Sequence, residues 1–248
     1  MCTLLGLAQA LVQSQCLEES SITLLYRAVK PILQTDAQSA RVQKRAYKAF
    51  AELCRQYPDF VTADGRLQDI IDLMIGATMV LQVSARYMCL RCISLVVKAL
   101  DIIDNQSHMN IIPSIMGEVL LSLKDANGKT REAAYQLLLN MSELYIQKND
   151  MTTYFQIIVG GLGAQTTHMR SAAVMALSRV VFEHARTDMS VQNLLPSLLQ
   201  TVIVLFDEES REVIKSAVGF VRVSIAALNK DQLEPILPDL VEGLMKYN

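Results

Sequence analysis

The sequence predicts an all-α protein built as an α-solenoid superhelix, in which helix hairpins stack one on another. Composition, an internal repeat and the placement of prolines support this prediction. Hydrophobic residues make up 51% of the 248 residues, whereas glycine (10), proline (6) and aromatic residues (6%) are scarce and tryptophan is absent. Such a composition favours helices built from Leu, Ile, Val and Ala. It excludes collagen-like and intrinsically disordered chains.

A helical pattern returns five times along the chain. Each copy places mostly apolar residues three, four, seven, eight and eleven positions after an anchor residue, which is one face of an α-helix. The anchors are spaced by 43, 45, 39 and 44 positions and are Ala46, Cys89, Ala134, Ala173 and Ala217. An amphipathic segment and a short polar loop precede each copy. The repeated unit is therefore a helix–loop–helix of the HEAT or armadillo class.

Each unit is expected to hold a first helix, a loop and a second helix that carries the anchor. The first helices are predicted at roughly 22–34, 67–81, 111–123, 153–162 and 191–206. Ser39, Ser84 and Thr166 are predicted N-caps of second helices, because their side-chain oxygens can accept from free backbone N–H groups. Gly128 is expected in a turn between helices, and residues 160–163 are expected at a helix end.

Prolines and chain ends fit the same plan. Pro113, Pro196 and Pro238 hold the same place in similar segments, two repeats and one repeat apart. A proline inside a helix bends it, as a curved stack requires. Residues 3–13 resemble a second helix alone, and residues 236–247 resemble a first helix alone. The sequence thus predicts one solenoid segment over residues 1–248, with about five full repeats and partial repeats at both ends.

Charge and cysteine content exclude several classes of protein. The net charge of −2 argues against an autonomous nucleic-acid-binding module. Five cysteines, an odd number set in apolar runs, indicate a reducing compartment and no disulfide framework. The charge-free stretches 151–169 and 189–206 contain polar residues together with glycine or proline, so no membrane span is expected. The chain is expected to be soluble and intracellular.

Several segments, in this order and spacing, resemble the ribosomal RNA-processing protein 12 family. Residues 42–53 (VQKRAYKAFAEL) are similar to an upstream piece of that family. The more specific segments are 122–138 (SLKDANGKTREAAYQLL), 154–163 (YFQIIVGGLG), 171–184 (SAAVMALSRVVFEH) and 211–228 (REVIKSAVGFVRVSIAAL). The resemblance covers the chain from about residue 42 to its end.

The resemblance implies a non-enzymatic HEAT-repeat scaffold of small-subunit ribosome biogenesis, located in the nucleolus and nucleus and shuttling to the cytoplasm. Its implied partners are proteins of the pre-ribosomal particle and pre-18S rRNA, with Ran and nucleoporins as further partners. Its implied role is to support pre-40S maturation and nuclear export. Two alternatives stay open: a karyopherin-type nuclear transport receptor and a phosphatase-type HEAT scaffold subunit.

A basic residue recurs near the start of every second helix, and stacked repeats turn these residues into a ladder. The ladder consists of Lys44, Arg86, Arg131, Arg170 and Lys215. One interpretation is a row of cations that faces phosphates or an acidic partner. The other is an internal ladder, in which Asp36, Asp125 and Glu208 pair with these cations and tie neighbouring loops together.

A second cluster of cations lies in residues 41–55, with Glu52 as the one acid among them. The cluster is either a solvated helix face or a contact to the RNA backbone, and Arg86, Arg91 and Lys98 extend it into the next repeat. Second helices line the concave side of HEAT stacks, so their exposed residues are the expected partner surface. The candidate binding residues are Arg41, Lys44, Arg45, Lys48, Arg86, Arg91, Arg131, Arg170 and Lys215.

No motif in the sequence indicates catalysis or cofactor binding. Cys89 and Cys92 form a lone CxxC pair on the apolar stripe, without the second pair that a structural zinc site needs. The histidines His108, His168 and His184 are isolated. Neither a phosphate-binding glycine loop nor a Ser/His/Asp set is present. We therefore expect no catalytic residue, cofactor, metal, small-molecule substrate or membrane partner.

Overall fold

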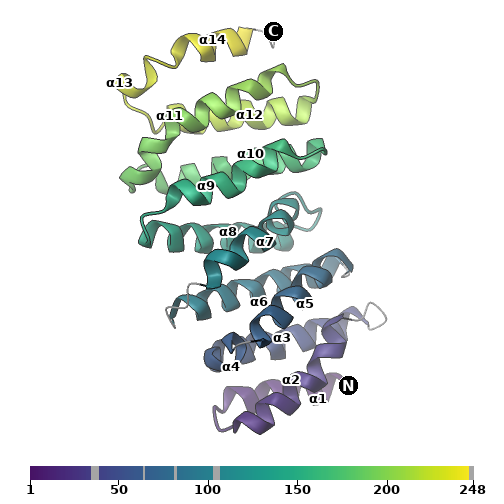
Figure 1. The fold of residues 1–248 in the computed structure, drawn as a ribbon. Coiled ribbons are helices and arrows are strands. Elements are labelled where there is room, and N and C mark those ends of the chain that lie inside the picture. The colour runs from purple at the N-terminus through teal and green to yellow at the C-terminus, as the bar shows by residue number, and fades with distance from the viewer. Residues whose placement is uncertain (35–38, 64, 81–82, 103–106, 246–248) are drawn as a thin grey trace. The chain divides into compact units, whose positions relative to one another are not determined.

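The computed structural model describes residues 1–34, 39–63, 65–80, 83–102 and 107–245, and within these ranges it contains helices and no strand (Figure 1). The all-α prediction is confirmed. In chain order the elements are α1 (Cys2–Gln13), α2 (Glu19–Gln34), α3 (Ala40–Gln56), α4 (Pro58–Thr62), α5 (Arg66–Val80), α6 (Val83–Ile102), α7 (Ser107–Ser122), α8 (Gly128–Gln147), α9 (Met151–Val159), η1 (Gly160–Gly163), α10 (Thr167–His184), α11 (Met189–Ile203), η2 (Val204–Asp207), α12 (Arg211–Ile225), α13 (Lys230–Leu233) and α14 (Leu237–Met245).

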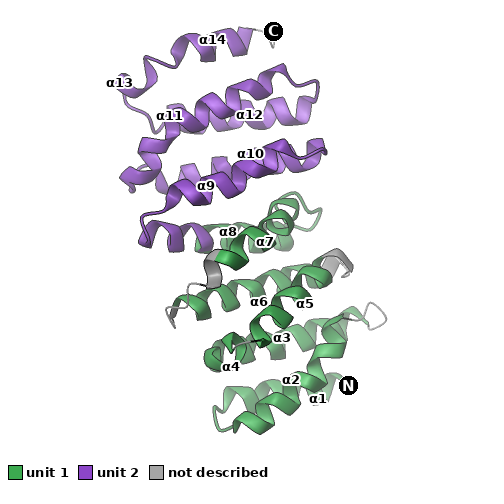
Figure 2. Ribbon diagram, viewed as in Figure 1, with its two compact units in different colours: residues 1–140 green, residues 141–248 purple. Residues whose placement is uncertain are grey.

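The helices pair as the repeat predicts. The pairs of first and second helices are α2 with α3, α5 with α6, α7 with α8, α9 with α10 and α11 with α12 (Figure 1). Second helices also pack on second helices of the neighbouring repeat, as α1 does on α3, α3 on α6, and α10 on α12. The chain forms two compact units, residues 1–140 and 141–248, and the boundary between them falls within α8 (Figure 2).

The predicted anchors lie in the core of these units. Ala46, Cys89, Ala134, Ala173 and Ala217 are each 0% exposed. Small residues at these places let neighbouring helices approach closely. The larger apolar residues at the repeated positions after each anchor, which we call the stripe, fill the space between first and second helices. One stripe residue departs from the prediction: Ile225 is 40% exposed. It ends α12, and within the described residues no further second helix follows to cover it.

Helix starts and ends agree in part with the sequence. The Thr166 side chain accepts a hydrogen bond from the Met169 backbone N–H (3.3 Å), so its predicted role as an N-cap is confirmed. Ser39 holds the N-cap position of α3, as predicted, but makes no side-chain cap bond; its backbone carbonyl accepts from the Val42 N–H at 2.8 Å. The side chain of Ser84 lies outside the described part of the chain.

One of the two glycine predictions is confirmed and the other is not. Residues Gly160–Gly163 form a 3₁₀ turn at the end of α9, as expected for a helix terminus. Gly128 is the first residue of α8 instead of lying in the turn. The turn comes just before it, where the Asp125 and Asn127 side chains accept from the backbone N–H groups of Asn127 and Lys129. Short side chains of this type stabilise such turns locally.

Polar bonds join equivalent places in successive repeats of the first unit. Lys30 on α2 contacts Asp69 on α5, and Tyr26 donates to the same carboxylate at 3.0 Å. Lys30 holds the pKa of Asp69 below its ordinary value by hydrogen bonding to the carboxylate. On the second helices, Asn140 Nδ2 donates to Ser94 Oγ at 2.6 Å. These bonds fix the register between neighbouring repeats.

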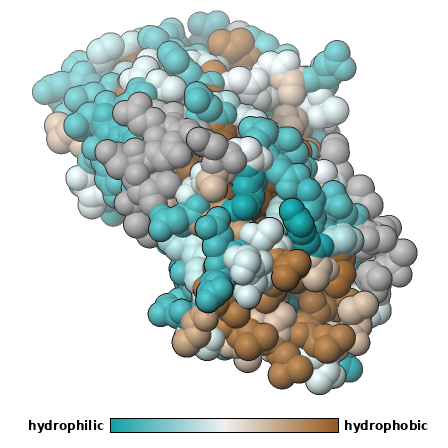
Figure 3. Space-filling view, turned by 60° about the horizontal axis from the view of Figure 1, so that its bottom comes forward, coloured by the Kyte–Doolittle hydropathy of each residue, from teal (hydrophilic) through white to brown (hydrophobic). Residues whose placement is uncertain are grey.

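The N-terminal end of the first unit exposes an apolar face (Figure 3). On α1, Met1, Leu4, Leu7 and Leu11 are between 53% and 65% exposed, while Leu5 and Val12 on the other side are buried. These side chains form an exposed apolar patch on α1.

One segment, Met189–Asp207, is long and apolar enough to cross a membrane by length and composition. It comprises α11 and η2, and polar residues such as Gln192, Ser197 and Thr201 interrupt it. Val191, Leu195 and Val202 are 0% exposed, and α11 packs against α12. The apolar side of α11 therefore belongs to the core of the second unit.

A half-buried histidine makes the second unit sensitive to acid. His184 Nε2 lies 2.8 Å from Ser142 Oγ, and burial holds the pKa of His184 below its ordinary value. The unfolded chain therefore binds a proton more readily than the folded chain, so stability falls as the pH drops below about 6.5. We expect the thermal midpoint to be lower at pH 5 than at pH 7.5, measured by circular dichroism. In His184→Gln this difference should shrink; an unchanged difference would contradict the assignment.

Candidate partner-binding surface

Two arginines of the predicted ladder form ion pairs between successive repeats. Arg86 Nη1, near the start of α6, lies 2.9 Å from Asp125 Oδ2 in the loop before α8. Arg170, near the start of α10, contacts both carboxylate oxygens of Glu208 at 2.8 Å. The pairs join residues 39 and 38 positions apart in the sequence. Arg86 and Arg170 therefore pair with acids of the same chain, as the internal-ladder interpretation predicts. The third predicted acid, Asp36, lies outside the described residues.

Arg131 and Arg170 also bind the loops that lead into their own helices. Arg131 Nη1 donates to the carbonyls of Asp125 (2.8 Å) and Ala126 (3.0 Å). Arg170 Nη1 donates to the carbonyls of Ala164 (2.8 Å) and Gln165 (3.0 Å). The two arginines thus make the same contacts, six and five residues back along the chain. Their guanidinium groups hold the loop between first and second helix in place.

The cations on α3 are arranged differently. Arg41, Arg45 and Lys48 are exposed and Lys44 is half-buried, and in the described part of the chain none of the four has an ion-pair partner. We call these four residues the α3 cationic strip. The acid in this helix, Glu52, does not neutralise it. Despite its burial, hydrogen bonds from Gln56, Gln13 and Arg55 hold the pKa of Glu52 below its ordinary value.

The remaining predicted residues lie in other places. Arg91 is exposed on α6, two residues after its anchor, which is the place that Lys48 takes on α3. Because α3 and α6 pack together, Lys48 and Arg91 lie on corresponding faces of neighbouring helices. Lys215 is exposed on α12, in the second unit. The α3 cationic strip and Arg91 therefore lie on neighbouring second helices, α3 and α6, which pack together.

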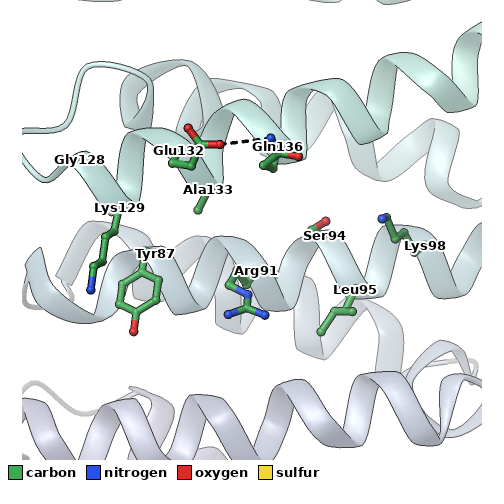
Figure 4. Close-up of a pocket in the computed structure, with 10 residues that line it drawn as sticks. All are labelled: Tyr87, Arg91, Ser94, Leu95, Lys98, Gly128, Lys129, Glu132, Ala133 and Gln136. Carbon is green, nitrogen blue, oxygen red and sulfur yellow. Dashed lines mark hydrogen bonds between the residues drawn. The ribbon is translucent and has the colours of Figure 1, made fainter.

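A groove of about 520 Å³ lies between α6 and α8, in the first unit (Figure 4). Its lining comes from five residues of each helix: Tyr87, Arg91, Ser94, Leu95 and Lys98 on α6, and Gly128, Lys129, Glu132, Ala133 and Gln136 on α8. Tyr87, Leu95 and Ala133 are half-buried, so they give the groove an apolar floor. We call this the α6–α8 groove. It lies between two second helices, where a partner surface is expected.

The sequence predicts Arg91 and misses the groove as a unit. Its three cations, Arg91, Lys98 and Lys129, come from two repeats, so no local run of basic residues marks it. Tyr87 and Glu132 each stand two residues before an anchor, where Tyr87 is half-buried and Glu132 is exposed. The equivalent Ser171 on α10 is fully buried, so this position alone does not mark the groove.

The CxxC pair lies in the core, as predicted. Cys89 and Cys92 are both 0% exposed, and burial raises the pKa of the Cys89 thiol to about 12. A thiol with so high a pKa is a poor nucleophile and a poor metal ligand. Among the residues that the structure describes, no three His, Cys, Asp or Glu side chains are grouped to hold a metal ion.

The fold agrees with what comparison with known proteins finds. A family model described as "Stalled ribosome sensor GCN1-like, HEAT repeats" matches residues 105–247, which is more than half of the chain. The chain belongs to this family of HEAT repeats. The repeat class predicted from the spacing of the anchors is thereby confirmed.

Curated relatives carry a more specific name. The chain is 28% identical to ribosomal RNA-processing protein 12 of Saccharomyces cerevisiae over 236 residues, which is 87% of the chain and 19% of that protein. It is 26% identical to the RRP12-like protein of Homo sapiens over 240 residues, which is 94% of the chain and 18% of that protein. The resemblance to this family is confirmed. The chain spans about a fifth of the length of these relatives.

Solved structures share the fold at low sequence identity. One is described as "TOG domain structure from C.elegans Zyg9" and matches with a TM-score of 0.58 and 11% identity over 89% of the chain and 84% of that structure. Another, described as "TOG-tubulin binding specificity promotes microtubule dynamics and mitotic spindle formation", matches with a TM-score of 0.57 and 11% identity over 92% and 84%. Both likenesses concern the fold alone.

Proposed function

We propose that this chain is a binding segment of a non-enzymatic scaffold in ribosomal RNA processing, one that acts on the small-subunit precursor. One observation carries the proposal: the chain is similar over most of its length to relatives named for ribosomal RNA processing. Its partners would be proteins of the pre-ribosomal particle and pre-18S rRNA. Ran and nucleoporins would join them during pre-40S maturation and nuclear export, in the nucleolus and nucleus.

The structure supports a role in binding through the character of its exposed residues. The α3 cationic strip presents guanidinium and ammonium groups that no described residue neutralises, and such groups bind RNA phosphates without reading sequence. The described residues hold no metal-ligand group, and the CxxC thiols are buried. A scaffold needs only shape and many modest contacts, which a stack of helix pairs supplies.

The proposal is tested by crosslinking the intact protein to RNA in cells and sequencing the attached RNA. Pre-18S rRNA is the expected product, together with small-subunit assembly proteins in the purified complex. Two results would favour the alternatives instead. Direct binding of Ran-GTP and a cargo without pre-ribosomal particles would indicate a karyopherin-type receptor. Co-purification of a phosphatase catalytic subunit would indicate a phosphatase scaffold.

The variant Arg45→Glu/Lys48→Glu should weaken binding of single-stranded RNA and reduce its dependence on salt. Both side chains are exposed, so the exchange leaves the core untouched. Losing two phosphate contacts should lower the slope of log K against log salt by about 1.4, since each contact contributes about 0.7. Filter binding at several salt concentrations measures the slope. The matched control is Arg27→Glu, an exposed arginine on the first helix α2; an unchanged slope in the double variant would refute the RNA contact.

A further inference from the structure

We propose that the α6–α8 groove binds an acidic, extended peptide segment of a partner protein, which inserts a bulky apolar side chain between the two helices. The groove holds Arg91 and Lys98, which extend the predicted cationic cluster, whereas the α3 cationic strip itself lies on a different helix. Variants of the groove therefore test the peptide proposal, and variants of α3 test the RNA contact.

The first argument is the apolar floor. Tyr87 and Leu95 on α6 and Ala133 on α8 are half-buried, and all three line a hollow of about 520 Å³. The small side chain of Ala133 leaves the hollow open on the α8 side (Figure 4). Pockets of a few hundred Å³ with an apolar floor and a few polar groups are typical ligand sites. An inserted aromatic or aliphatic side chain would gain free energy by leaving water here.

The second argument is the charge around the floor. Arg91 and Lys98 are exposed cations, and in the described part of the chain neither has an ion-pair partner. Lys129 extends from α8 alongside the Tyr87 ring, with Nζ 6.0 Å from the ring centroid (Figure 4). The lining therefore holds three cations against one acid, Glu132. This excess selects carboxylate-rich partners by charge complementarity.

Glu132 does not cancel this preference. Its Oε1 accepts a hydrogen bond from Gln136 Nε2 at 3.2 Å on the same helix (Figure 4). The carboxylate is therefore held along α8 by an intrahelical bond. In addition, α8 begins at Gly128, so the positive end of its helix dipole lies at the rim that carries Lys129. Both features leave the field of the groove positive.

The third argument is length. Tyr87 and Lys98 are eleven residues apart on α6, which corresponds to about 16 Å along the helix. An extended chain advances about 3.3 Å per residue, so a segment of about five residues covers this distance. Carboxylates at both ends of such a segment would reach Lys98 and Lys129, with the apolar side chain between them.

Single-stranded RNA fits this groove less well. RNA-binding grooves alternate cations with several aromatic platforms, on which successive bases stack. Tyr87 is the one aromatic residue among those that line this groove, and Lys129 already lies near its ring. The floor is otherwise aliphatic, which suits a protein side chain better than a phosphate backbone.

The test uses fluorescence anisotropy with labelled peptides and the whole protein. One probe is an acidic peptide of about ten residues with a central phenylalanine, and the second replaces that phenylalanine by serine. We expect the first probe to bind at least about tenfold more tightly than the second. Arg91→Glu/Lys98→Glu should weaken the first probe by at least about tenfold, because it reverses two of the three cations. Ala133→Phe should also weaken it, because the ring fills the floor.

Arg27→Glu serves again as the control and should bind both peptides as the unchanged protein does, and melting curves confirm that each variant is folded. Three results would overturn the proposal. They are an absence of binding up to about 1 mM peptide, equal binding of both peptides, and binding that the groove variants do not change. An oligouridine probe of similar length that displaces the peptide, and is itself weakened by Arg91→Glu/Lys98→Glu, would identify the groove as an RNA site instead.

Discussion

Replacing Ala46 by aspartate is expected to unfold most of the first unit, with a loss of about 4 kcal/mol or more in unfolding free energy. Ala46 is 0% exposed on α3, a helix that packs against α1, α2 and α6. The new carboxylate has no water to solvate it, and the close approach of these helices leaves little room for its atoms. Urea unfolding followed by circular dichroism measures the loss.

The matched control is Ala28→Asp. Ala28 also lies within a helix of the first unit, but it is exposed on α2. Replacing Ala28 by aspartate should lower the unfolding free energy only through the lower helix propensity of aspartate, by about 0.7 kcal/mol or less. Similar losses for Ala46→Asp and Ala28→Asp would show that the anchor does not lie in the core, and the repeat assignment would then fail.

Removing the Arg170 guanidinium by Arg170→Met is expected to lower the stability of the second unit by about 2–3 kcal/mol. The exchange breaks the two contacts to Glu208 and the two bonds to the carbonyls of Ala164 and Gln165. The Glu208 side chain is only 25% exposed, so its carboxylate would be left partly desolvated and unpaired. Thermal and urea unfolding of the variant give the loss.

A double-mutant cycle with Glu208→Gln separates the two kinds of contact. We expect a coupling of about 1–2 kcal/mol between Arg170 and Glu208, with the rest of the loss due to the loop carbonyls. Arg211→Met is the control, because Arg211 is an exposed arginine at the start of α12 in the same unit. If Arg170→Met costs no more than this control, the arginine does not brace the repeats and is available to an external ligand.

The repeat architecture was accessible from sequence because it depends on local periodicity. A helix face repeats every three or four residues, and the five anchors share this face at near-constant spacing. All five proved to be fully buried. The short helix α4, Pro58–Thr62, escaped prediction because five residues are too few to show a period. Ile225 was placed in the core wrongly, because burial depends on a neighbouring helix that the local pattern cannot reveal.

The candidate site was less predictable, since it depends on which charges meet across repeats. From the sequence, Arg86 and Arg170 could each bind an external ligand or pair within the chain. Only the folded chain shows that Asp125 lies beside the first and Glu208 beside the second. The α6–α8 groove needs a tyrosine from one repeat and a lysine from the next, about forty residues on. The α3 cationic strip was easier to find, because one helix carries all of it.

The bracing of neighbouring repeats by arginines changes how basic residues should be counted in this chain. Arg86, Arg131 and Arg170 are occupied by carboxylates and loop carbonyls of the same molecule. An approaching polyanion would have to compete with these intramolecular partners. The protein should accordingly release fewer counterions on binding a polyanion than its 23 lysines and arginines suggest.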